Sequence, residues 1–293
     1  MSIGHHTTVW PVAIFAHNEG RFIIDSINSV VHQRDIGAAV KIYVLANGCS
    51  DDTEEHVAEF AKGRDDVELV SIKTGDKSNA WNVYVHELAL EHDIHFFLDG
   101  DTRAHTSALS ELAKGLETEP QANGAAAFPF IGRSKRQWSN FIRTQRGMPG
   151  CLYALRGSFV DRVRTLDVKL PVGFIGEDVL LQFLVKSNLA PERKRQERER
   201  ITLCEEAGFE FDTMSGADFR DWKLYWKRNV RNAEREHQSR LLMPLLQEKG
   251  LGAMPRRVEQ LYEENAAQVR FRWSGIDTLF HWFVVKKIRR HRS

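Results

Sequence analysis

The sequence contains little cysteine. Its 293 residues include three cysteines, Cys49, Cys151 and Cys204. Their number is odd, and no CxxC or paired Cys and His spacing of the kind that forms a zinc site is present. This pattern does not predict a zinc site, and a reducing compartment is the simplest expectation.

Long apolar runs and a large net charge are also missing. No basic start with a long apolar stretch precedes Phe15, and no segment reaches the roughly 18 to 20 apolar residues that span a bilayer. The 41 basic and 40 acidic residues leave a formal charge of +1, so no global field draws the chain onto nucleic acid. We therefore expect a soluble, cytoplasmic chain in which any electrostatic targeting is local.

Apolar residues, at 42%, are frequent enough for one large core, or for one core with a small helical appendage. Over the first hundred residues, short apolar runs alternate with amphipathic stretches. This alternation predicts an α/β, Rossmann-like fold in which parallel strands are joined by right-handed helical crossovers. The predicted strands are residues 9–16, 40–46, 67–72 and 94–101.

The rest of the chain is less regular. A helix near residues 107–117 and short strands near 124–132 and 150–158 indicate a mixed extension of the sheet. From about residue 218 the pattern is helical, with a Gly/Pro break at 250–255. We predict a larger domain over residues 1–215 and a small C-terminal helical region over 216–293.

Polar segments follow each of the four predicted parallel strands. The carboxyl ends of such strands meet at one edge of an open sheet, where ligands bind. Together the segments supply Asn and Asp acceptors for a base and a ribose, one Lys for a phosphate, and two carboxylates for a divalent cation. This inventory suits a nucleoside diphosphate. The segments are AHNEG at 16–20, ANGCSDDT at 46–53, GDKSNAWN at 75–82 and LDGDT at 98–102.

Asp99-Gly100-Asp101 is the strongest of these pieces. Two acidic residues separated by a glycine, directly after an apolar strand, leave room for an ion and its phosphate ligands. Hard oxygen ligands select Mg²⁺ or Mn²⁺. Alternatively, Asp and Gly are favoured in turns by backbone geometry alone.

A second acidic pair, Glu177 and Asp178, follows Gly176 and precedes the apolar run 179–185, which indicates a buried helix. Acidic residues at a helix start are stabilised by the macrodipole and can cap free amides. Alternatively, a carboxylate placed there near a sugar donor accepts a proton from an attacking hydroxyl.

These ordered motifs resemble those of family 2 of the glycosyltransferases, which have the GT-A fold. The resemblance covers roughly residues 9–185. It implies an inverting, metal-dependent enzyme of the hexosyltransferase type, which uses a nucleotide-sugar donor and forms no covalent intermediate. The matching segments are AHNE at 16–19, NGCSDDT at 47–53, KSNAWN at 77–82, DGD at 99–101, GCLYALRGS at 150–158 and GED at 176–178.

The resemblance also implies roles for single residues. Asp101 would hold the Mn²⁺ or Mg²⁺ ion, with Asp99 sharing the ion or lying nearer the ribose and Gly100 leaving room between them. Asp178 would be the general base, and Glu177 would support the acceptor. The donor nucleotide would be bound by Ala16, Asn18, Glu19, Asn47, Asp51, Lys77 and Asn82. On this basis, residues 9–102 would bind the nucleotide sugar and residues 103–215 would form the acceptor side.

The sequence departs from the family pattern in two places. Asn47 stands where many members carry an aspartate that contacts uracil. We expect a UDP-linked donor, with Asn47 in place of that aspartate. The nearest matches to the Gln, Arg and Trp signature of processive members are residues 225–232 and 268–273, and neither has the right spacing. We therefore expect the addition of one sugar per encounter.

Three residues of the helical region are weaker candidates for binding the metal ion or the diphosphate. His237 either completes a metal shell or is an ordinary surface histidine. Arg228 and Arg231 either clamp a diphosphate or belong to a charged helix face.

The C-terminal tail joins an aromatic stretch to five Lys or Arg among residues 286–292. This composition is typical of an interfacial helix whose Phe280, Trp282, Phe283 and Val284 insert into an anionic membrane surface. Alternatively, Leu279, Phe283 and Ile288 pack on the catalytic domain while the basic end is solvated. Binding of nucleic acid by this patch is a weaker hypothesis.

The sequence therefore predicts transfer of one sugar from a nucleotide sugar to a saccharide or lipid-linked acceptor. The expected setting is the assembly of surface polysaccharide or glycolipid, in the cytoplasm or on the inner face of the membrane. One alternative is a catalytically silent scaffold that binds a nucleotide. A sugar-nucleotide pyrophosphorylase is less favoured, because AHNEG is not the Gly-rich basic loop expected after its first strand.

Overall fold

The computed structural model describes residues 8–34, 36–88, 91–131, 135–211, 220–265 and 278–290. The chain divides into two compact units, one of residues 1–167 with 197–212 and one of residues 168–196 with 213–293. The sequence prediction divided the chain once, after residue 215, whereas the second unit also takes in residues 168–196. Each unit is described by itself.

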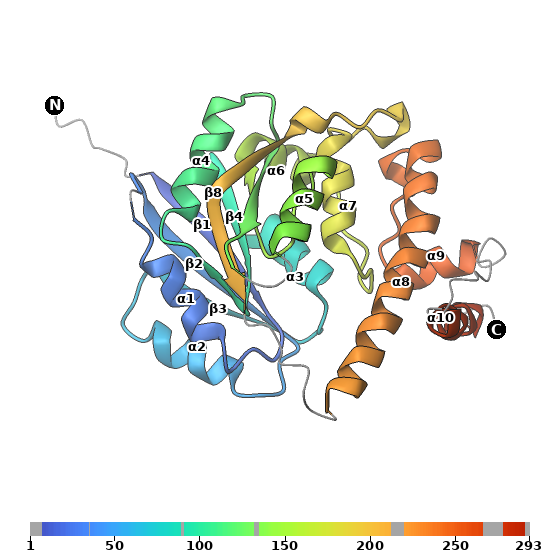
Figure 1. Cartoon of the computed structure of the whole chain (residues 1–293), viewed down its shortest axis with the longest axis horizontal. Helices are drawn as coiled ribbons and strands as arrows, with labels where there is room; N and C mark the ends of the chain where they lie inside the picture. Colours follow the sequence, from blue (N-terminus) through green and yellow to red (C-terminus); the bar gives the residue numbers. More distant parts are fainter. Residues whose placement is uncertain are drawn as a thin grey trace. The chain divides into compact units, whose positions relative to one another are not determined.

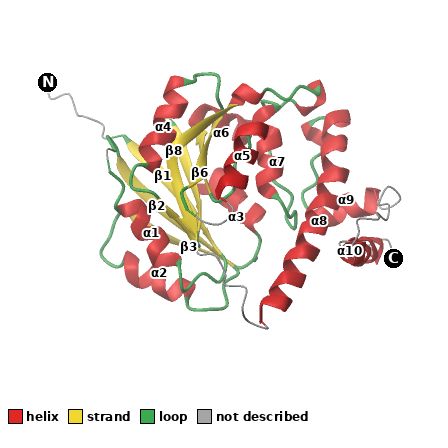
Figure 2. Cartoon of the chain, in the orientation of Figure 1, coloured by secondary structure: helices red, strands yellow, loops and turns green. Residues whose placement is uncertain are grey.

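The first unit is built on one mixed sheet of eight strands in the order β3-β2-β1-β4-β7-β6-β8-β5 (Figures 1 and 2). Strands β3, β2, β1 and β4 run parallel, β7 is antiparallel to both β4 and β6, and β5 is antiparallel to β8. The predicted α/β fold with a parallel first half and a mixed extension is therefore confirmed. The strands are β1 Val9–Ala16, β2 Ala39–Asn47, β3 Val67–Ile72, β4 Ile94–Asp99, β5 Thr102–Ala104, β6 Gly124–Pro129, β7 Leu152–Arg156 and β8 Ile201–Phe211.

Helices cover both faces of this sheet (Figure 2). Along β1, Val12, Ile14 and Ala16 belong to an aliphatic cluster that includes apolar residues of α1, α2 and α4. The alternate residue Phe15 points to the opposite face, because successive side chains of a strand alternate. The helices of this unit are α1 Ile23–Val31, α2 Thr53–Ala61, α3 Lys77–Val83, a π-helical turn Tyr84–Leu88, α4 Ala108–Thr118, α5 Lys135–Gln145 and α6 Gly157–Thr165, with a 3-10 turn at Arg198–Arg200.

The second face of the sheet is packed by aromatic rings. Phe97 of β4 stacks on Tyr153 with ring centroids 4.7 Å apart, and it meets Tyr84 edge-on at 5.3 Å. The Tyr84 hydroxyl lies 3.0 Å from Nδ1 of His95, whose side chain is fully buried. These contacts hold the end of α3 against the middle of the sheet, which orients the first residue of α3, Lys77.

The second unit is helical in its described residues. Its elements are α7 Glu177–Lys186, a 3-10 turn Pro191–Arg193, α8 Arg220–Lys249, a 3-10 turn Leu251–Ala253, α9 Val258–Asn265 and α10 Thr278–Arg290. Helix α8 ends before Gly250, at the predicted Gly/Pro break, where Gly250 has φ of 74°. Within the described ranges, no helix combines the length and the apolar character needed to cross a bilayer.

Candidate functional site

The loops that follow β1 and β2 are tied to each other at the carboxyl edge of the sheet. The Asn18 side-chain oxygen accepts hydrogen bonds from the Ser50 amide at 2.7 Å and the Ser50 hydroxyl at 3.2 Å. Asn18 itself has φ of 59°, a left-handed conformation that asparagine tolerates better than most residues. The Gly20 amide donates to the Asp51 carboxylate at 3.0 Å. Two predicted nucleotide-binding residues, Asn18 and Asp51, therefore hold the loops together.

The carboxylate of Asp51 is held as an anion within this loop. It accepts from the Thr53 amide at 3.1 Å and from the Thr53 hydroxyl at 2.5 Å. Burial works against the charge, but the hydrogen bonds from Thr53 and Gly20 outweigh it and leave the pKa of Asp51 below its usual value. These contacts hold the Asp51 carboxylate within its own loop.

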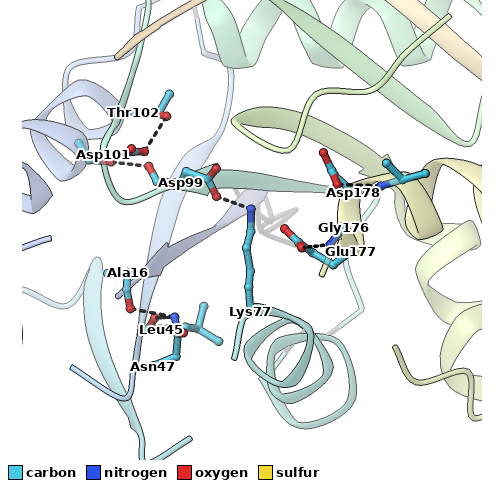
Figure 3. A network of polar contacts seen from close by, with 12 residues as sticks. Ala16, Leu45, Asn47, Lys77, Asp99, Asp101, Thr102, Gly176, Glu177 and Asp178 are labelled. Carbon is cyan, nitrogen blue, oxygen red and sulfur yellow. Dashed lines mark hydrogen bonds and ion pairs between the residues drawn. The ribbon is translucent and has the colours of Figure 1, made fainter. Parts of the chain in front are cut away.

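Asn47, at the end of β2, is almost fully buried, and both of its amide contacts lie inside the sheet (Figure 3). Its Nδ2 donates to the carbonyl of Ala16 at 2.8 Å and to the carbonyl of Leu45 at 3.3 Å. Carbonyl oxygens only accept, so these two partners orient the amide with Nδ2 inward. A ligand that contacts this side chain can therefore meet only its oxygen, Oδ1.

The Asp99-Gly100-Asp101 segment begins at the end of β4, where Asp99 pairs with Phe15 of β1. The Gly100 amide donates to the Phe15 carbonyl at 2.8 Å. A Cβ on Gly100 would lie 3.0 Å from that carbonyl oxygen and 3.1 Å from the Cα of Ala16. Glycine therefore favours the close passage of this segment along β1, because a side chain would push the backbone of β1 away by a few tenths of an ångström, a role that residue spacing did not indicate. Asp101, which comes next, is exposed.

Lys77 reaches from the first turn of α3 to the end of β4 (Figure 3). Its ammonium lies 2.5 Å from a carboxylate oxygen of Asp99 and 5.7 Å from the centre of the Phe15 ring. About a quarter of each charged side chain is exposed. Asp76 caps the helix by accepting from the Asn79 amide at 2.7 Å, which fixes where α3 begins. The structure thus brings the predicted phosphate-binding lysine onto one of the two predicted metal-binding carboxylates.

Negative charge is concentrated around this segment. Burial raises the pKa of Glu19 to about 7, and the charges of Asp101 and Asp99 add to the effect. In the described part of the chain, no three His, Cys, Asp or Glu residues are placed to hold a metal ion by themselves. A Mg²⁺ or Mn²⁺ ion in a nucleotide site usually takes one or two carboxylates and completes its shell with phosphates and water. The two aspartates and the surplus of negative charge fit an ion of that kind.

The loop after β3 contacts the loops after β1 and β2, and two glycines, Gly48 and Gly75, allow the close approach. Gly48 has φ of 61°, and a Cβ there would lie 2.5 Å from the amide nitrogen of Gly75. A Cβ on Gly75 would in turn lie 3.0 Å from the ring of His17. The loops after β1, β2 and β3 are therefore in direct contact, and side chains larger than hydrogen would separate them.

We expect Gly48→Ala to lower the free energy of unfolding by about 3 kcal/mol, because the methyl group meets backbone and the residue must keep a positive φ. Two control variants separate the cost of the positive φ from the cost of the close contact. Gly63 also has a positive φ but faces open space, so Gly63→Ala should cost only about 1 kcal/mol. Gly37 has neither a positive φ nor a close neighbour, so Gly37→Ala is the control without either constraint. Urea unfolding measures all three, and an equal effect of Gly48→Ala and Gly63→Ala would show that the loop contact is dispensable.

The remaining residues of the first unit that are predicted to bind the nucleotide are Ala16, Glu19 and Asn82. Ala16 is fully buried at the end of β1 and accepts the Asn47 hydrogen bond through its carbonyl. The Glu19 amide donates to the Thr53 hydroxyl at 2.8 Å, and Asn82 is buried on α3. The contacts of Ala16 and Glu19 add to the joining of the first two loops.

The predicted catalytic pair belongs to the second unit. Helix α7 begins at Glu177, after Gly176, whose φ is 103°. Glu177 accepts a hydrogen bond from the Gly176 amide at 3.3 Å, and Asp178 accepts one from the Val179 amide at 2.9 Å. Both carboxylates are half-buried. Their contacts lie at the start of the helix, where the macrodipole favours acidic residues.

The loop before α7 is held by Gln238 of α8, a residue that the sequence analysis did not single out. The side-chain oxygen of Gln238 accepts from the Ile175 amide at 2.6 Å. Its amide nitrogen, Nε2, donates to the Gly173 carbonyl at 3.3 Å and to the Tyr262 hydroxyl at 2.7 Å. Gln238 is fully buried, so it is a positioning residue for the Glu177 and Asp178 turn. No local signal marks it, because its partners lie more than 60 residues away or on α9.

His237, the neighbour of Gln238, is buried, so its interpretation as a surface histidine is wrong. Its Nε2 lies 3.2 Å from Nδ1 of His281 on α10. Burial and the neighbouring His281 lower the pKa of His237 to about 4. Arg231 is exposed, and the side chain of Arg228 lies outside the described residues.

Solved glycosyltransferase structures share this fold. S. aureus TarS (residues 1–349) aligns with a TM-score of 0.52 at 15% identity, over 97% of this chain and 92% of that one. Glucosyl-3-phosphoglycerate synthase from Mycobacterium tuberculosis, in complex with Mn²⁺, UDP and glucosyl-3-phosphoglycerate, gives 0.52 at 20% identity, over 78% and 80%. The mannosyltransferase PcManGT from Pyrobaculum calidifontis, in complex with GDP-Man and Mn²⁺, gives 0.55 at 15% identity, over 99% and 86%.

At these identities the structural likeness shows the GT-A fold alone. No curated protein sequence matches the chain. The model of the glycosyl transferase family 2, however, matches residues 12–177, which is more than half of the sequence and includes the loops described above. The chain belongs to glycosyl transferase family 2.

Proposed function

We propose that this protein transfers one sugar from a nucleoside diphosphate sugar to a hydroxyl group, with inversion at the anomeric carbon. The observation that carries the proposal is the joining of the loops after β1, β2 and β3 beside the Lys77–Asp99 ion pair and Asp101. These groups lie at the carboxyl edge of the parallel strands, where open α/β sheets bind ligands.

The orientation of Asn47 supports a base that carries a ring N–H. Its amide nitrogen is used by the carbonyls of Ala16 and Leu45, so a base that reaches this side chain meets an acceptor. Uracil, thymine and guanine present a ring N–H on the pairing edge, whereas cytosine and adenine present a ring acceptor. Among these, a UDP-linked sugar is our expectation, with Asn47 in place of the usual aspartate. The neighbours crystallised with UDP and with GDP-Man fall within this group.

Asp101 and Asp99 would hold a Mn²⁺ or Mg²⁺ ion, which supplies positive charge to the departing diphosphate when it is bound. Lys77 lies against Asp99 and carries a second positive charge at the same edge. Gly100 keeps the segment against β1, so that the two carboxylates leave the strand end at fixed positions. The Mn²⁺ in the two ligand-bound neighbours is consistent with this assignment.

Asp178 is the proposed general base, with Glu177 supporting the acceptor. The Asp178 carboxylate is oriented by its hydrogen bond from the Val179 amide, and a carboxylate can take a proton from an attacking hydroxyl. Gln238 fixes the loop that leads into this turn. The hydroxyl attacks the anomeric carbon on the side opposite the diphosphate, so no covalent intermediate forms.

The acceptor is expected to be a saccharide or a lipid-linked saccharide, in the assembly of surface polysaccharide or glycolipid at the cytoplasmic face of a membrane. This part of the proposal rests on membership of the family and on the basic, aromatic C-terminal helix.

Thermal unfolding tests the donor site. We expect one nucleoside diphosphate, UDP first, to raise the unfolding temperature by about 5 °C in the presence of Mn²⁺, because a ligand at roughly 100 times its Kd stabilises the native state by about 2.7 kcal/mol. The panel contains UDP, GDP, CDP, TDP and their sugar conjugates, each with Mn²⁺, Mg²⁺ or EDTA. The shift should vanish with EDTA.

The Asp101→Ala variant should lose this shift, while Asp65→Ala should keep it. Asp65 is an exposed acid before β3, at the opposite end of the parallel strands. A shift that survives both EDTA and Asp101→Ala would contradict the metal site. Binding without turnover on any acceptor would favour the silent scaffold, and consumption of a nucleoside triphosphate with a sugar phosphate would identify a pyrophosphorylase.

A further inference from the structure

Helix α10 exposes a second apolar face in addition to the one it buries. Phe280, Val284, Val285 and Ile288 are buried within the second unit. On the other side, Leu279, Trp282 and Phe283 are exposed by 49%, 45% and 42%. A helix that needed only to pack would carry polar residues there, so the outward apolar residues require a separate explanation.

Trp226 of α8 continues this exposed surface. Its ring is 39% exposed and meets Phe283 edge-on at 5.3 Å between centroids. Trp282 and Phe283 also contact each other, at 5.2 Å. Leu279 lies one helical turn before them on the same face. We call Trp226, Leu279, Trp282 and Phe283 the aromatic patch; it comes from α8 and α10, which contact each other through Trp226 and Phe283.

Basic side chains follow the aromatic patch by one turn. The ammonium of Lys286 lies 5.0 Å from the centre of the Trp282 ring. Lys287 pairs with Glu234 at 2.7 Å and is still half-exposed, and Arg289 is exposed. Residues 278–290 include no acidic residue. The outward face of α10 therefore changes along its length from apolar and aromatic to positively charged.

We propose that the aromatic patch and the basic end of α10 bind the surface of an anionic lipid bilayer. Tryptophan and phenylalanine rings lie favourably at headgroup depth, where Trp282 can keep its indole N–H hydrated. Lysine and arginine next to them meet lipid phosphates. The acids packed against α10 come from α8, where Glu234 is buried and paired with Lys287 and Glu236 lies beside His281. An acidic protein or a nucleic acid would use the charges but would leave the exposed leucine and phenylalanine unexplained.

The structure corrects both interpretations of the tail made from the sequence. Phe280 and Val284, expected to insert into a membrane, are buried in the unit, and Leu279, expected to pack, is exposed. Ile288 is buried as expected, but α10 packs against α8 of the second unit, whereas the sequence interpretation placed it on the catalytic domain. The two interpretations are therefore compatible, because one face of α10 packs while the other carries the proposed lipid contact. The inference deepens the membrane part of the proposed function, and its test does not depend on the reaction.

Sedimentation of the full chain with vesicles tests the inference without donor or acceptor. We expect binding to vesicles of phosphatidylcholine with phosphatidylglycerol, weaker binding to phosphatidylcholine alone, and loss of the difference at high salt. Replacement of Trp282 and Phe283 by Ser should weaken binding at least about tenfold, and Lys286→Gln about fivefold. Both sites are exposed, and an unchanged unfolding temperature will show that the variants fold.

Leu166→Ser and Lys114→Gln are the matched controls, since both residues are exposed and lie in the first unit. They should bind vesicles like the unaltered protein. Equal weakening by the control and patch variants, or equal binding to neutral and anionic vesicles, would overturn the inference. So would a lipid-independent dimer that Trp282→Ser dissociates, because the patch would then be a contact between two copies of the chain.

Discussion

The Asp178→Asn variant is expected to lose about 10³-fold in kcat while its affinity for the nucleoside diphosphate changes by less than about twofold. The amide keeps the shape of the side chain but cannot accept the proton of an attacking hydroxyl. The donor site is assigned to the first unit, whereas Asp178 lies in the second, in the first turn of α7. Release of nucleoside diphosphate measures kcat, and calorimetric titration measures donor binding.

Two comparisons make this result specific. Glu177→Gln should reduce kcat less and should raise KM for the acceptor, because Glu177 is assigned to acceptor binding rather than to proton transfer. Asp161→Asn, at an exposed acid of α6, should change neither constant. If Asp178→Asn retains at least about a tenth of the turnover, Asp178 is not the base. If donor affinity falls together with kcat, its role is in binding.

Acidification is expected to destabilise the protein strongly, because two histidines are buried in the neutral form. Burial, with smaller contributions from His92 and Arg164, lowers the pKa of His95 to about 3, and burial lowers that of His237 to about 4. Between these values and about 6.5, the unfolded chain holds more protons than the folded one, so stability falls as the pH falls. At about pH 5, each histidine should cost on the order of 2 kcal/mol relative to neutral pH.

Urea unfolding at several pH values measures this dependence. His95→Phe should reduce the loss between neutral pH and about pH 5 by on the order of 2 kcal/mol, although the variant leaves the Tyr84 hydroxyl without its partner and is less stable at neutral pH. His32→Gln, at an exposed histidine on the surface, should leave the dependence unchanged. An unaltered slope in His95→Phe would mean that His95 is not the group that titrates.

Elements with a strong local signal were predicted well. The predicted strands 9–16 and 67–72 coincide with β1 and β3, and β2 is one residue longer than predicted at each end. Strand β4 begins where predicted but ends at Asp99, two residues before the predicted end. Each is a short apolar run bounded by polar turn residues, so its neighbours in sequence are enough to define it. The loops that follow were located for the same reason.

Elements that depend on distant partners were missed. Strand β8, Ile201–Phe211, was not predicted, because its alternation is interrupted by Glu205 and Glu206 and it is held by pairing with β6 and β5. Helix α5 was also missed, although Trp138, Phe141 and Ile142 have helical spacing; of its eleven residues only Ser139 and Ile142 are buried.

The sequence by itself determined the α/β class, the order of the parallel strands along the chain and the family motifs, because these depend on residues that are adjacent or one helical turn apart. Only the tertiary structure decided that Asn47 turns its amide nitrogen inward, that Lys77 pairs with Asp99, that Gln238 holds the turn before Glu177, and which face of α10 is exposed. Each of these depends on a contact between residues distant in sequence. Such contacts form only when the sheet and the helices pack, so no local pattern contains them.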